Sequence, residues 1–146
     1  MSIQDNKALA RRYFEEYTNA RNTALAGEIL TPDVAVHGLS SPTLESRGIE
    51  ELAEFLGGMS VAFPDLQITI DDMIAEADKV VVLNTVRGAN TGEYQGMPPT
   101  GRQIALSSFS MFRIEDGRIA EIWNLADTLG MMQQMGLIPT PEVAAA

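Results

Sequence analysis

Residues 116–127 read DGRIAEIWNLAD, in which a tight turn at Asp116-Gly117 leads into a strand that ends in two polar groups, Asn124 and Asp127. An Asp-Gly pair between two alternating stretches is a strong signal for a β-hairpin. The stretch therefore predicts two paired strands, 104–114 and 118–125. Only one of the two polar groups at the end of the second strand is a carboxylate.

The rest of the chain divides into a helical first half and a strand-rich second half. Periodicity predicts helices over 5–20 and 24–30 and from Ser46 onward, then alternating strands from Leu66 and over 79–87. Helices followed by antiparallel strands indicate an α+β fold. We expect a cone-shaped barrel, in which a curved, mostly antiparallel sheet wraps around the N-terminal helices and encloses an apolar pocket.

The length of 146 residues fits one domain, expected over 1–138, with a flexible tail over 139–146. A formal net charge of -10 makes nucleic acid an unfavourable partner, because phosphates would be repelled over most of the surface. No apolar run approaches the ~18 residues of a membrane span. We therefore expect a cytoplasmic protein that does not bind nucleic acid or membranes.

The absence of cysteine excludes disulfides, thiolate catalysis and Cys-based metal sites. With a single histidine, a metal site would need carboxylates alone, and no calcium-type spacing is present. We expect neither a metal nor a cofactor.

Four segments carry a resemblance to a known family. They are the first helix with Tyr17, residues 36–38 with the helix start at Arg47-Gly48, residues 92–102 (GEYQGMPPTGR), and residues 112–127. In this order they resemble the SnoaL-like family of small polyketide cyclases, which have the nuclear transport factor 2-like fold. The resemblance implies aldol-type ring closure without a cofactor, and a homodimer formed through the outer face of the sheet with Phe109, Met111 and Trp123.

The resemblance also implies an acid/base aspartate at the end of the last strand, supported by a histidine on the preceding strand. The matching positions here are Asn124 and Ser110. An amide can orient a substrate or donate a hydrogen bond, but it cannot cycle a proton near neutral pH. Strand alternation places Ser108 and Phe112 on the same face as Ser110. Ser108, Ser110 and Asn124 therefore form a candidate polar spot, which either binds an oxygen of a ligand or only forms hydrogen bonds among its own side chains or with a water.

Two residues could supply the missing proton transfer. Asp127 is either a pocket base or the N-cap of a final helix. His37, the only histidine, is either a pocket base on a strand that faces the pocket in relatives or a structural side chain. Tyr17 could close the pocket mouth or belong to the core, and Arg87 could hold an enolate or lie in solvent.

Three functions follow from these residues. The first is a cofactor-independent aldol cyclase or isomerase that acts on a hydrophobic, polyketide-like carbonyl compound, with His37 or Asp127 as base and Asn124 and Ser110 steadying the enolate oxygen. The second is a binding protein that has lost the cyclase aspartate. The third, an epoxide hydrolase or accessory hydroxylase, ranks last because the second acidic group that a hydrolase needs is missing.

Overall fold

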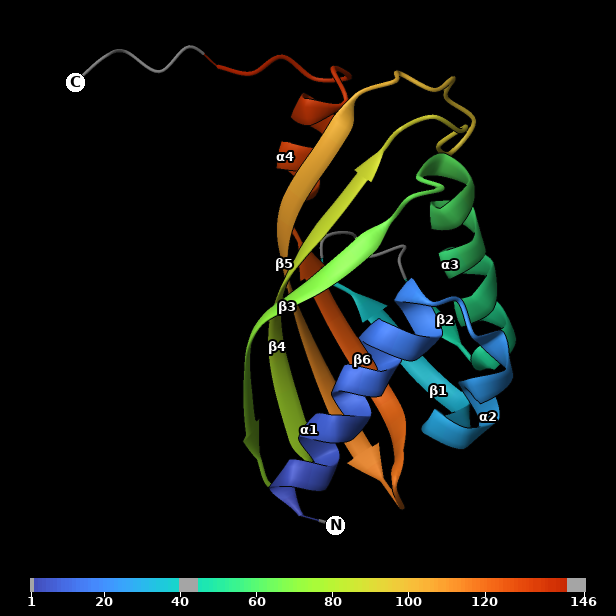
Figure 1. Ribbon diagram of the computed structural model, residues 1–146, viewed down its shortest axis with the longest axis vertical. Helices are drawn as coiled ribbons and strands as arrows, with labels where there is room; N and C mark the ends of the chain where they lie inside the picture. The colour runs from blue at the N-terminus through green and yellow to red at the C-terminus, as the bar shows by residue number, and fades with distance from the viewer. Residues whose placement is uncertain (1, 40–44, 142–146) are drawn as a thin grey trace, which may run out of the picture.

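The computed structural model describes residues 2–39 and 45–141 and places helices against one face of a six-stranded curved sheet (Figure 1). The elements in chain order are α1 (Ile3–Arg12), the π-helix η1 (Tyr13–Asn19), the 3-10 helix η2 (Thr23–Leu25), α2 (Ala26–Ile29), β1 (Leu30–Gly38), β2 (Glu45–Arg47), α3 (Ile49–Ala62), β3 (Gln67–Glu76), β4 (Lys79–Ala89), β5 (Gln103–Glu115), β6 (Arg118–Ala126) and α4 (Thr128–Gln134). The predicted α+β class is confirmed.

The strands follow the order β2-β1-β6-β5-β4-β3, and only β1 and β6 pair in parallel. The predicted hairpin joins β5 and β6. Both residues of its turn have positive φ, 49° at Asp116 and 78° at Gly117, which is the conformation that an Asp-Gly pair tolerates best. The β1–β6 pairing brings the first strand of the chain beside the last.

The sheet remains open and does not close into the barrel that the sequence analysis expected. β2 and β3 are its two edges. At the β3 edge, the side-chain amide of Asn19 donates to the carbonyl of Ile68 at 2.8 Å and accepts from the Ile68 N–H at 2.8 Å. The side chain thus takes the place of a neighbouring strand at this point of the edge.

The first helix differs from the continuous amphipathic helix predicted over 5–20. It changes to a π-helix at Tyr13, and the Thr18 hydroxyl donates to the Tyr13 carbonyl five residues earlier at 2.9 Å. The wider turn points Tyr13, Phe14 and Tyr17 toward the interior, where all three are buried.

Three further boundaries differ from the sequence prediction. The strand predicted over 34–37 begins earlier, at Leu30, so the short helix before it ends at Ile29. Ser46 lies in β2 and is not a helix cap, because α3 begins after Gly48, whose φ is 91°.

Among the described residues, none of the helices is long and apolar enough to cross a membrane.

Candidate functional site

The inner face of β5 carries the residues that strand alternation predicted. Ser108, Ser110 and Phe112 are buried, whereas Phe109 on the other face is half exposed. β5 lies between β4 and β6, so its inner side chains meet those of two neighbours. The middle of the sheet is therefore where polar groups can be assembled inside the fold.

Three polar side chains, one each from β4, β5 and β6, form a hydrogen-bonded line across the inner face of the sheet. The Ser110 hydroxyl donates to Oδ1 of Asn124 at 2.8 Å, and Nδ2 of Asn84 lies 3.5 Å from Oγ of Ser110. Asn84 is 1% exposed and Ser110 is 4% exposed, so water can contribute little to satisfying them. We refer to Asn84, Ser110 and Asn124 as the polar line.

The polar line separates two apolar clusters of the core. One cluster contains Phe112, Val82 and Ile122. The other contains Leu106, with Val86 and Ala126 packed against it. On each of the three strands the inner positions therefore change from apolar to polar and back to apolar. Burying polar groups in such a place costs free energy unless they are paired, which makes the line a candidate binding site.

Asn84 is the member of the polar line that the sequence analysis missed. It interrupts the inner-face series of Val80, Val82 and Val86 on β4, where only apolar side chains would be expected. This single break in the alternation was the signal that could have identified it.

The direction of the hydrogen bonds determines what the line can do. Because the Ser110 hydroxyl donates to the oxygen of Asn124, the Asn124 amide nitrogen is the atom available to a ligand. The site can therefore donate to a carbonyl or enolate oxygen, but it holds no carboxylate that could accept a proton.

His37 lies on the opposite face of the sheet from Asn124, which favours the structural role, one of the two roles that the sequence left open. Its Nε2 lies 2.6 Å from Oε2 of Glu121, and its Nδ1 lies 2.6 Å from Oε2 of Glu45. The ring also stacks on Trp123, with centroids 5.4 Å apart. The register explains the placement, because His37 pairs with Trp123 of β6, whose side chain points outward.

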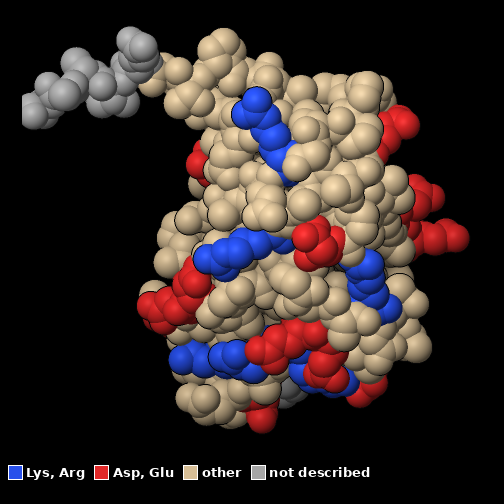
Figure 2. Space-filling model, turned by 45° about the horizontal axis from the view of Figure 1, so that its top comes forward, with Lys and Arg blue, Asp and Glu red and all other residues tan. Residues whose placement is uncertain are grey.

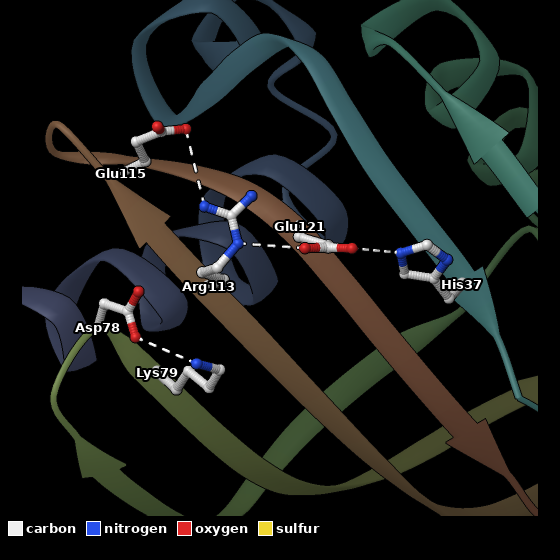
Figure 3. Close-up of polar contacts among 6 residues, drawn as sticks. All are labelled: His37, Asp78, Lys79, Arg113, Glu115 and Glu121. Carbon is white, nitrogen blue, oxygen red and sulfur yellow. Dashed lines mark hydrogen bonds and ion pairs between the residues drawn. The ribbon is translucent and has the colours of Figure 1, made fainter.

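The carboxylates around His37 favour its charged form. The hydrogen bond to Glu121 is the main cause that raises the pKa of His37, and the same contact lowers the pKa of Glu121. Arg113 donates to the other Glu121 oxygen at 3.1 Å, so side chains from β5, β6 and β1 form one charged row (Figure 3). An imidazole that holds its proton in this way is poorly suited to act as a base.

Asp127 is the N-cap of α4, one of the two roles that the sequence left open. Its Oδ1 accepts from the Gly130 N–H at 2.9 Å, and the residue is exposed. It follows β6 directly, three residues after Asn124. The capping hydrogen bond uses one of the two carboxylate oxygens.

The remaining candidates fall in three different places. Phe112 is fully buried and packs edge-on against Tyr13 and Phe14, so it belongs to the core. Tyr17 is 3% exposed and lines a cleft of about 170 Å³ between η1 and α3. Arg87 is exposed on the outer side of the sheet, as its parity with Leu83 and Thr85 allowed.

The buried polar side chains in the part of the chain that the structure describes are neutral. Among the described residues, the buried polar groups other than tyrosine are Asn6, Asn84, Asn90, Ser108 and Ser110. No group of His, Asp or Glu in that part of the chain is arranged to hold a metal ion. The charged groups lie at the surface, and Figure 2 shows basic and acidic side chains interspersed over one face.

Comparisons with known proteins agree with this architecture. The family model for SnoaL-like polyketide cyclases matches residues 8–135. An aklanonic acid methyl ester cyclase of Streptomyces peucetius is 30% identical over 141 residues, covering 92% of this chain and 93% of that protein. A second cyclase of this name, from Streptomyces sp. (strain C5), is 28% identical over 137 residues, covering 92% and 84%.

A solved structure extends the comparison to three dimensions. The crystal structure from Jannaschia sp. CCS1 that is described as a SnoaL-like polyketide cyclase superposes with a TM-score of 0.85. The two chains are 26% identical, and the match covers 95% of this chain and 97% of that one.

Proposed function

Because the chain belongs to the SnoaL-like polyketide cyclase family, we propose that it closes or isomerises a hydrophobic carbonyl compound by proton transfer, without a cofactor. The observation that supports this proposal is the polar line of Asn84, Ser110 and Asn124 in an otherwise apolar interior. Its neutral donors suit the oxygen of a carbonyl group as it becomes an enolate.

In this mechanism the polar line stabilises the developing charge, and a carboxylate removes the proton from carbon. Asp127 fits the second role better than His37. It is a carboxylate that directly follows β6, three residues after Asn124. His37, in contrast, lies on the other face and is paired with two glutamates. The proton is later returned to the product oxygen or carbon, so that the enzyme ends unchanged.

The test uses aklanonic acid methyl ester, the compound named for the two relatives. We expect the wild-type protein to convert it, with the product separated by chromatography. Asn124→Leu should reduce turnover by ~100-fold, which is typical for the loss of one oxyanion donor. Ser110→Ala should also reduce turnover, because the Ser110 hydroxyl donates to Oδ1 of Asn124 and so orients its amide group. Ser107→Ala is the matched control, because Ser107 is exposed on the other face of the same strand. Equal turnover in Ser107→Ala and Ser110→Ala would contradict the assignment of the polar line.

A separate variant tests the proposed base. Asp127→Asn retains a good N-cap residue, so α4 should keep its stability. If Asp127 accepts the proton, turnover should fall ~100-fold or more while the melting temperature changes little. His37→Gln provides the comparison, since we expect it to leave turnover within a few-fold of wild type. The reverse result would assign proton transfer to His37.

A second function is a non-catalytic small-molecule-binding protein. It is favoured by one observation, namely that no described interior residue is a carboxylate or histidine. Binding of the same ester without turnover would support this function. The double variant Ser110→His/Asn124→Asp would then show whether replacing the two residues is enough to produce cyclisation.

A further inference from the structure

The cleft between η1 and α3 lies outside the polar line, because none of its lining residues belongs to that line. Its volume is about 170 Å³. One wall is formed by Tyr17, Thr18 and Arg21, and the other by a single face of α3 with Leu56, Gly57 and Ser60. Leu66 also lines the cleft. The cleft thus lies between two helical segments, beside the residue that precedes β3.

We propose that this cleft binds one ring of a flat apolar compound that carries an oxygen or carboxylate substituent. An apolar cavity of ~150 Å³ accommodates a benzene ring, so the volume suits one ring and not a polycyclic molecule. This inference rests on the hydrophobic ligand of the proposed function and identifies where part of that ligand binds. It does not require turnover.

The polar groups of the cleft determine the substituent. Burial raises the pKa of Tyr17, so its phenol stays protonated and can donate a hydrogen bond. Arg21 is the one charged side chain among the described lining residues. Its guanidinium donates to the carbonyl of Pro64, which fixes it beside the cleft. A neutral oxygen or an anion therefore fits better than a cation.

Aromatic contacts connect the cleft to the polar line. The rings of Tyr17 and Tyr13 lie 5.7 Å apart, and those of Tyr13 and Phe112 lie 5.3 Å apart. Phe112 shares the inner face of β5 with Ser110, two residues away. A ring bound in the cleft would extend this aromatic series toward the surface.

Two adjacent glycines of α3 provide the experiment. A Cβ atom has open space at both Gly57 and Gly58, but only Gly57 lines the cleft. Leucine is ~1 kcal/mol more favourable than glycine in a helix, so both Gly57→Leu and Gly58→Leu should fold. Calorimetric titration with benzoate would measure binding. We expect Gly57→Leu to weaken binding at least ~10-fold and Gly58→Leu to match the wild type.

Charge is tested with two further probes. Benzylamine should bind at least ~10-fold more weakly than benzoate, and Arg21→Gln should reduce the preference for benzoate over benzyl alcohol. Unchanged benzoate binding in Gly57→Leu, or equal binding of benzylamine and benzoate, would overturn the inference. If Gly57→Leu loses benzoate binding but the wild type does not cyclise the ester, the result would support the cleft as a binding site and contradict the proposed activity. If the wild type cyclises the ester and Gly57→Leu binds benzoate normally, the result would contradict the cleft as a binding site and support the proposed activity.

Discussion

At the scale of the residue, His37 gives the protein a specific dependence of stability on pH. Its raised pKa, caused first by Glu121, means that folding favours its protonated form. The stabilisation is fully present below the unfolded pKa of ~6.5 and is lost as the pH rises through the higher folded value. The lowered pKa of Glu121 acts in the opposite sense, since its contribution is lost only as the pH falls through that value. The ion pair therefore contributes most to stability between the ordinary pKa of Glu121, 4.5, and the ordinary pKa of His37, 6.5.

His37→Gln should lower the free energy of unfolding by ~1 kcal/mol at pH 6, a size typical of partly exposed ion pairs. The difference from the wild type should shrink above the folded pKa of His37. Urea unfolding at several pH values measures it, and His37 is the only histidine in the chain. Glu121→Gln is the matched variant, because it should return the histidine pKa toward its ordinary value. A pH-independent difference between wild type and His37→Gln would contradict the assignment.

At the scale of the element, one side chain attaches the π-helix to the sheet. Asn19 makes two hydrogen bonds to the backbone of Ile68 at the edge of β3. Asn19→Ala would leave a partly buried donor and acceptor without this partner, at a cost of about 2 kcal/mol. Asn22→Ala is the control, because Asn22 is exposed and makes no side-chain cap contact. Urea unfolding of the two variants should show the difference, and equal stabilities would refute the role of Asn19.

The helices and strands differ in how far the sequence could predict them. The hairpin at Asp116-Gly117 and the inner face of β5 followed from local turn chemistry and alternation, and both are confirmed. The π-helix could not be predicted in this way. It is accompanied by the hydrogen bond from the Thr18 hydroxyl to the Tyr13 carbonyl and by the contact of Asn19 with Ile68, 49 residues further along the chain. The face of His37 depended on the parallel pairing of β1 with β6, which no local pattern contains.

At the scale of the whole molecule, the outer face of the sheet carries apolar side chains that are exposed among the described residues. Phe109 is 51% exposed and Leu125 is 50% exposed, and the two pair across β5 and β6. Leu83 pairs with Phe109 from the other side, and the adjacent row is Val81, Met111 and Trp123. A contiguous apolar face of this kind is typical of a surface that binds a protein partner. We predict that a second copy of the chain covers it in a symmetric dimer.

Phe109→Glu tests this dimer, because it places a charge in the centre of the apolar face. We expect the wild type to be a dimer at micromolar concentration by light scattering and Phe109→Glu to be a monomer with an unchanged circular dichroism spectrum. Phe55→Glu is the matched control, since Phe55 on α3 is 46% exposed but lies away from the sheet's outer face. It should remain a dimer. A monomeric wild type, or equal dissociation of both variants, would contradict the prediction, because burial of this face requires that Phe109 and not Phe55 be desolvated.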